Sequence, residues 1–140
     1  MAHSIEITMH EANKAYSEGK YRRAIEIYQR LLQKDNKDAL AHERLAQCFY
    51  KIGDFDRSII ECRNALDLQP NLAFPHLVIG KINAKRKDLD QAELEIKRAL
   101  ELDQQLVEAY IALGAIRFEN KNYQDASTMF LKAIELDPHS

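Results

Sequence analysis

Residues 18–32 read EGKYRRAIEIYQRLL, and a related stretch recurs after every 34 residues along the chain. The further copies are IGDFDRSIIECRNAL from residue 52, RKDLDQAELEIKRAL from residue 86 and NKNYQDASTMFLKAI from residue 120. In each copy a short turn is followed by small and apolar side chains at helical spacing. A fixed period of this length indicates a repeat protein, in which each copy is one supersecondary unit.

The period divides the chain into four repeats, residues 5–38, 39–72, 73–106 and 107–140, and we number the places within each repeat from 1 to 34. Small residues recur at places 8 and 20, where we expect helices to touch, and large residues recur at places 17 and 24. The residues at place 8 are Ala12, Ala46, Gly80 and Gly114, and those at place 20 are Ala24, Ser58, Ala92 and Ala126. We therefore predict a single domain over residues 5–140, preceded by an N-terminal extension of residues 1–4.

This pattern resembles the tetratricopeptide repeat family, whose signature includes a large residue at place 4, Ala at place 20, an aromatic residue at place 24 and Pro at place 32. Tyr28 and Phe130 match at place 24, and Pro70 and Pro138 match at place 32. The chain departs from the family's tryptophan at place 4, where it has Thr8, His42, His76 and Tyr110. The resemblance implies an all-α fold, an α-solenoid of four helix-turn-helix hairpins stacked into a right-handed superhelix.

The residue pattern agrees with that expectation. Apolar residues recur at helical spacing on both sides of each turn, which predicts two amphipathic helices of about 12 to 14 residues per repeat. Pro75 suits the first turn of the third repeat's first helix, and Asn71 is expected to cap that helix. At place 15, Lys87 and Lys121 stand where the first two repeats have glycine, and we expect the same left-handed turn to be kept there.

Composition excludes several classes of function. The net charge is −2, so no strong field attracts the chain to nucleic acid or to an anionic membrane. No apolar run approaches the roughly 20 residues of a membrane span, and the N-terminus lacks the apolar region of a signal peptide. We expect no membrane insertion and a cytoplasmic location.

No motif for catalysis, for phosphate binding or for metal binding occurs in the sequence, so we expect no enzyme activity, no cofactor and no metal. His10 follows Glu6 by one helical turn, and we interpret the two as an exposed pair. His42 and His76 fill the family's large-residue slot, where packing is the expected role. Cys48 and Cys62 are interpreted as small buried hydrophobic residues, with a reactive thiol as the weaker alternative.

The candidate binding surface lies on the first helix of each repeat. At about 100° per residue, places 2, 5, 6, 9, 12 and 13 face away from the helix's own hairpin and from the preceding one. In the resembling family this side lines a concave surface that receives extended peptides or partner helices. The predicted groove residues are Met9, Asn13, Tyr16, Leu40, Arg44, Gln47, Tyr50, Lys51, Phe74, Leu77, Val78, Lys81, Lys85, Ile111 and Phe118.

Phe74 and Val78 stand out in this set. Places 2 and 6 are expected to face away from both packing seams, where a large apolar side chain lowers solubility unless a partner covers it. We expect the ligand to be a short apolar motif or an amphipathic helix with acidic flanking residues for the basic side chains of the groove. The predicted function is a non-enzymatic protein-interaction scaffold. The alternatives are a self-assembling structural module and the recognition segment of a larger multidomain protein.

The two ends of the array differ in polarity. Lys14 and Lys34 occupy places of the first repeat that are apolar in later repeats, so the N-terminal face is adapted to water. In the last repeat, Leu131 and Ile134 make the C-terminal face more apolar than its predecessors. Arrays of this kind need a polar terminal face for solubility, so we expect this self-association face to be covered, either by a further downstream helix or by a second copy in a homodimer.

Overall fold

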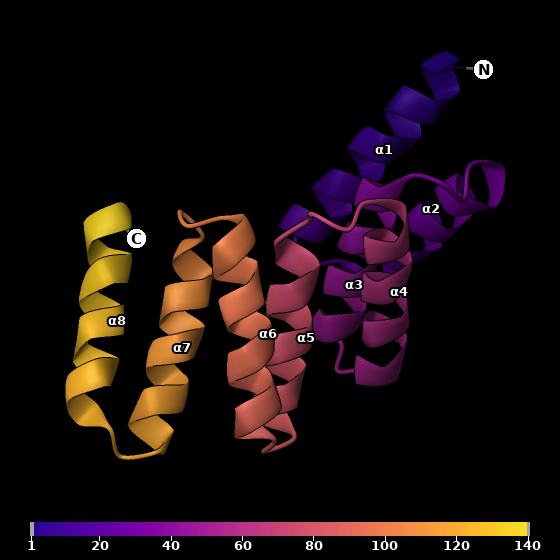
Figure 1. Ribbon diagram of the computed structural model, residues 1–140. Helices are drawn as coiled ribbons and strands as arrows, with labels where there is room; N and C mark the ends of the chain where they lie inside the picture. The colour runs from indigo at the N-terminus through magenta and orange to yellow at the C-terminus, as the bar shows by residue number, and fades with distance from the viewer. Residues whose placement is uncertain (1, 140) are drawn as a thin grey trace. The chain divides into compact units, whose positions relative to one another are not determined.

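A computed structural model of the protein describes the backbone of residues 2–139 and the side chains of residues 8–139. This part of the chain folds into eight α-helices and contains no strand, which confirms the all-α prediction. The helices are α1 (Ala2–Ser17), α2 (Tyr21–Lys34), α3 (Ala39–Lys51), α4 (Phe55–Leu68), α5 (Phe74–Lys85), α6 (Leu89–Leu102), α7 (Val107–Glu119) and α8 (Tyr123–Leu136). Consecutive helices pair into hairpins, α1 with α2 and so on to α7 with α8 (Figure 1).

The helices match the predicted repeats closely, with one extension at the start. α1 begins at Ala2, so residues 2–4 form the first turn of a helix that continues into the first repeat. The side chains of residues 2–7 lie outside the described residues, and with them the expected contact between Glu6 and His10. By contact, the chain divides into two compact units of two hairpins each, unit 1 up to Asn71 and unit 2 from Leu72. The prediction of a single domain over 5–140 stays a prediction.

The turn inside each hairpin has the predicted left-handed residue at place 15. Gly19 and Gly53 have φ angles of 77° and 82°, and Lys87 and Lys121 adopt 66° and 64°. A residue with a Cβ atom, such as lysine, is sterically strained in this conformation, whereas glycine is not. The last two hairpins therefore keep the shape of the first two in spite of their sequence.

Aspartate side chains cap the N-termini of α3, α4 and α6. Asp38, Asp54 and Asp88 each accept a hydrogen bond from the backbone N–H three residues later, at 3.1 to 3.3 Å. Such caps satisfy N–H groups that have no partner within the helix. The predicted cap at Asn71 is wrong: α5 begins at Phe74 after Ala73, which makes no side-chain cap, and Pro75 occupies its first turn as expected. A proline there replaces an N–H that would otherwise need a partner.

Small residues at places 8 and 20 bring the two helices of a hairpin into contact. The Ser58 hydroxyl in α4 donates to the carbonyl oxygen of Ala46 in α3 at 2.7 Å, and both residues are fully buried. In unit 2, a Cβ added at Gly80 would lie 3.1 Å from the carbonyl oxygen of Ala92. The repeated small residues therefore set the spacing between paired helices, as predicted.

Each unit has its own hydrophobic core. The core of unit 1 joins α1, α2 and α3 around Tyr28, Leu31 and Leu45. The core of unit 2 joins α5, α6 and α7 around Leu77, Ile96 and Leu113.

Candidate functional site

Part of the predicted groove in unit 1 surrounds a small cavity of about 200 Å³ on the first helices of repeats 1 and 2. Its lining residues are Asn13, Tyr16, Tyr28, Leu40, Glu43, Arg44 and Gln47. Five of these are predicted groove residues, and the sequence prediction missed two, Tyr28 and Glu43. The structure thus brings α1 and α3 together around one pocket, which we call the Asn13 cavity.

Hydrogen bonds fix the polar side chains at the Asn13 cavity. The Tyr28 hydroxyl donates to Asn13 Oδ1 at 2.5 Å, and Arg44 Nη1 donates to the same oxygen at 2.6 Å. Burial raises the pKa of Tyr28 and the nearby Arg44 opposes this shift, so the phenol keeps its proton and stays a donor. Asn13 and Arg44 are therefore held in one arrangement before any ligand binds.

Glu43 adds a buried acidic group to the same cavity. The residue is only 8% exposed, and it lines the cavity beside Arg44. Burial raises the pKa of Glu43, and the charge of Arg44 opposes that shift. The residue occupies place 5, where the other repeats have Met9, Leu77 and Ile111. That exchange of an apolar residue for a carboxylate is the sequence signal that could have identified it.

Other predicted groove residues of unit 1 also support the hairpins themselves. The rings of Tyr16 and Tyr21 lie 5.4 Å apart, and those of Tyr50 and Phe55 lie 5.6 Å apart. Each of these pairs joins the two helices of one hairpin across the turn. Met9 packs against the core of unit 1. Lys51 is exposed, and so is about half of the Leu40 side chain.

In unit 2, the expectation that Phe74 and Val78 are exposed is wrong. Phe74 is partly buried and packs against the core of unit 2, and Val78 is only 3% exposed. Leu77 is also fully buried in that core. The helical wheel placed these residues on a solvent side, but place 6 lies at the rim of the packed surface, where Ala112 of α7 also contacts the core. These side chains therefore support folding.

The basic side chains of the predicted groove in unit 2 are partly engaged. Lys81 Nζ lies 3.7 Å from Glu108 Oε2, which links α5 to α7. Lys85 is exposed at the end of α5. Ile111 and Phe118 are exposed apolar residues of α7, as the groove prediction requires.

A second ion pair links α6 to α7. Arg117 Nη1 and Lys97 Nζ both contact Glu93, Lys97 at 3.2 Å. Burial raises the pKa of Glu93, but hydrogen bonds from Arg117 and Lys97 outweigh it, so the net shift is downward. Arg117 stands at place 11 of the fourth repeat, and its contact with Glu93 joins the third repeat to the fourth.

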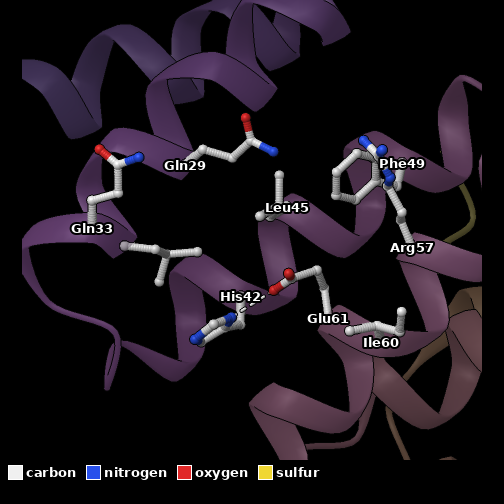
Figure 2. A pocket seen from close by; sticks show the side chains of 9 residues that line it. Gln29, Gln33, His42, Leu45, Phe49, Arg57, Ile60 and Glu61 are labelled. Atoms are coloured by element: carbon white, nitrogen blue, oxygen red, sulfur yellow. Dashed lines mark hydrogen bonds and ion pairs between the residues drawn. The ribbon is translucent and has the colours of Figure 1, made fainter.

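The B-groove is a larger cavity of unit 1 that the sequence did not predict. It has a volume of about 520 Å³, and Figure 2 shows its side chains extending from α2, α3 and α4. Its lining residues are Gln29, Leu32, Gln33, His42, Leu45, Phe49, Arg57, Ile60 and Glu61. Arg57 lies over the ring of Phe49, with 5.8 Å between the guanidinium carbon and the ring centroid. A histidine–carboxylate pair forms part of the wall of the B-groove.

That pair joins His42 to Glu61, with Nδ1 and Oε2 2.6 Å apart (Figure 2). The same arrangement recurs one repeat later, where His76 Nδ1 lies 2.8 Å from Glu95 Oε2. His42 is buried as expected, but its ring also makes a hydrogen bond with the Glu61 carboxylate. Glutamate occurs at place 23 only in the two repeats that have histidine at place 4, and this covariation within the chain was the available signal.

The two thiols are buried, as predicted. Cys48 and Cys62 are both free cysteines with no exposed surface. Burial raises the pKa of each thiol to about 12. Since the thiolate is the nucleophile, neither group is arranged for reactivity.

The described residues contain no cluster of three or more histidine, cysteine, aspartate or glutamate side chains that could hold a metal ion. Among the helices described, none is both long and apolar enough to cross a membrane. The expected cytoplasmic location stays a prediction.

The predicted self-association face is exposed at the last hairpin. Leu131 and Ile134 are 62% and 58% exposed, and Phe118 and Tyr123 next to them are similarly exposed. A cavity of about 320 Å³ lies among these side chains. The structure thus brings the two predicted residues together on one apolar surface.

Helical hairpins that recur every 34 residues define an all-α repeat protein, the architecture of α-solenoids. The family profile described as Tetratricopeptide repeat matches residues 10–73, and a second profile with that description matches residues 107–140. These matches together span more than half of the chain. The chain belongs to the tetratricopeptide repeat family and is, in general terms, a protein-interaction scaffold with protein partners.

Solved structures of MamA are similar to this chain. A crystal structure of MamA superposes with a TM-score of 0.78 at 19% identity, covering 96% of this chain and 78% of MamA. A second MamA crystal structure gives a TM-score of 0.75 at 22% identity, covering 99% and 75%. The MamA 41-end fragment from Desulfovibrio magneticus RS-1 gives 0.78 at 18% identity, covering 96% and 76%. At these identities the likeness shows the fold alone. The comparison with curated proteins found no match.

Proposed function

We propose that this chain is a non-enzymatic scaffold that binds a peptide or an amphipathic helix along the first helices of its repeats, with the Asn13 cavity as the principal contact. The observation that carries the proposal is the pair of hydrogen bonds to Asn13 Oδ1, from Tyr28 and Arg44. Polar groups held in place before binding lose little freedom when a ligand arrives, and this lowers the cost of association.

The cavity offers groups that suit a polypeptide. Asn13 Oδ1 is occupied by its two donors, so the amide NH₂ group of Asn13 is the part that can donate to a carbonyl oxygen of the ligand. The half-exposed side chain of Leu40 supplies an apolar contact beside these polar groups. An apolar surface with a few fixed polar groups is the usual composition of a binding site.

Glu43 narrows the chemistry of the ligand. Burial disfavours the charged form of its carboxylate, and a donor group that reaches Glu43 from the cavity stabilises that form. We propose that the ligand presents a lysine, an arginine or a backbone N–H to Glu43. This revises the expected acidic flank, because Lys81 already contacts Glu108 within the chain.

The proposal is tested by site-specific crosslinking. A photoreactive residue in place of Leu40 should capture a partner from a lysate, and Asn13→Ala and Arg44→Ala should each reduce that capture about tenfold or more. Arg22→Ala is the matched control, because Arg22 is an exposed arginine of α2 outside the cavity. Circular dichroism checks that the variants stay folded. Undiminished capture by folded Asn13→Ala and Arg44→Ala proteins would remove the cavity from the proposed function.

The alternative that the chain is the recognition segment of a larger multidomain protein involves the same binding surface. It therefore does not change the proposed mode of binding. Self-assembly rests on a different surface and is argued next.

A further inference from the structure

One side of α8 forms a continuous stripe that no other helix of unit 2 covers. Tyr123, Ser127, Leu131 and Ile134 follow one another at intervals of four, four and three residues, which places them on the same side of the helix. All four are exposed, and the ring of Phe118 lies beside Tyr123 with 5.2 Å between the centroids. We call these five residues the α8 stripe.

The corresponding places in α2 and α6 show which side chains are covered when the next hairpin stacks on a repeat. In unit 1, α3 packs on α2 and buries Ile25 at place 21 and part of Leu32 at place 28. In unit 2, α7 packs on α6 and contacts Glu93 at place 21. A hairpin added in the manner of the repeats would therefore cover places 21 and 28 of the last repeat.

Place 25 behaves differently. Gln29 and Lys97 occupy this place in the first and third repeats, and both stay exposed although a hairpin is packed beside them. The last repeat has Leu131 here, with 62% of its surface exposed. A further stacked hairpin would leave this leucine in water. The stripe is explained better by a partner that lies over the middle of α8.

The chemistry of the chain's own N-terminal face argues against a head-to-tail contact between copies. Place 10 is buried and apolar in later repeats, as in Cys48 and Ile116, but in the first repeat it is the exposed Lys14. Lys34 is also exposed at the end of α2. Stacking this face on Leu131 would bury ammonium groups against apolar side chains without a counter-charge.

The stripe is complementary to itself. When two copies of α8 lie antiparallel with their centres near residue 129, Ser127 of one copy faces Leu131 of the other, and Tyr123 faces Ile134. The small side chain of Ser127 then meets the larger Leu131 of the other copy, as small and large side chains do in a packed core. We propose that two copies of this chain associate through the α8 stripe as an isologous two-fold dimer. This inference does not depend on the Asn13 cavity.

Sedimentation equilibrium of the whole chain tests the proposal. Between roughly micromolar and millimolar concentration, the mass should rise from that of the 16.2 kDa monomer toward twice that value. Leu131→Lys should weaken association by at least tenfold. Leu94→Lys is the matched control, because Leu94 is an exposed leucine of α6 outside the stripe, and it should leave association unchanged. The Asn13→Ala protein should show the same increase of mass with concentration as the wild type. A failure of the dimer proposal can therefore be told apart from a failure of the proposed binding at the Asn13 cavity.

Cysteine crosslinking tests the register. An equimolar mixture of Ser127→Cys and Leu131→Cys proteins should form disulfide-linked dimers faster than either protein alone, and the native thiols are buried. A monomeric wild type at every concentration would overturn the proposal. So would association that Leu131→Lys does not weaken, or a monomer whose stripe captures a different protein.

Discussion

The ring of His42 is held between two acceptors. Its Nδ1 lies 2.6 Å from Glu61 Oε2 in the next helix, and its Nε2 lies 2.9 Å from the carbonyl oxygen of Asn36 before its own helix. A carbonyl oxygen only accepts, so Nε2 carries a hydrogen atom. A second proton then lies between Nδ1 and the carboxylate, and His42 ties the start of α3 to α4.

Removing the ring should destabilise the second hairpin. His42→Phe leaves the largely buried Glu61 carboxylate without its partner, so we expect a loss of about 1–3 kcal/mol in the free energy of unfolding. Urea denaturation measures the effect. His42→Phe with Glu61→Leu should recover part of the loss, and His10→Phe, an exposed histidine of α1, should change little. Additive effects of the two substitutions would show that the pair is not coupled.

Replacing the two lysines that have positive φ angles, Lys87 and Lys121, by glycine should stabilise the protein. Lys121→Gly relieves a positive φ angle of 64° and should increase the free energy of unfolding by roughly 1 kcal/mol. Lys87→Gly should gain less, because Lys87 Nζ also contacts Glu119 at 2.7 Å. The reverse change, Gly53→Lys, should lower the melting temperature. A lower melting temperature for Lys121→Gly would contradict this explanation.

Gly114 of α7 lies against the ring of Phe130 in α8. A Cβ added there would lie 2.6 Å from Phe130 Cε1, so the ring must move. Alanine gains about 1 kcal/mol in helix propensity over glycine, whereas overpacking costs about 1–3 kcal/mol. We expect a net loss for Gly114→Ala in thermal denaturation. In a Phe130→Leu background, which removes the ring, the same substitution should become stabilising.

Thiol chemistry should report the integrity of unit 1. Cys48 and Cys62 should not react with a thiol reagent such as DTNB at pH 8 until the protein unfolds, because burial raises both pKa values to about 12. The folded state keeps protons that the unfolded state releases. The contribution of the two protonated thiols to the free energy of unfolding should therefore be fully present below pH 9, the ordinary thiol pKa. It should be lost as the pH rises toward 12. Rapid labelling of the folded protein would show that one helix opens locally.

The sequence predicted most of the hairpin architecture because that architecture repeats. Four copies of a pattern identify the places of turns and of small residues even where one copy departs from it, as at Lys87. The prediction failed where burial depends on how far neighbouring helices extend over a side chain. The wheel treats one helix alone, so it placed Val78 in water, although the residue is buried. It also missed Glu43, because a single acidic residue on a mixed surface has no periodicity.

The separate core of unit 1 has a consequence for synthesis on the ribosome. Its residues lie between positions 9 and 52, so every contact in that cluster joins segments that are close in sequence. Contacts of this kind form quickly, because little loop entropy is lost in closing them. A nascent chain can therefore bury its first core while the second half is still being translated. The growing chain then exposes little apolar surface at any one time, which limits aggregation during its production.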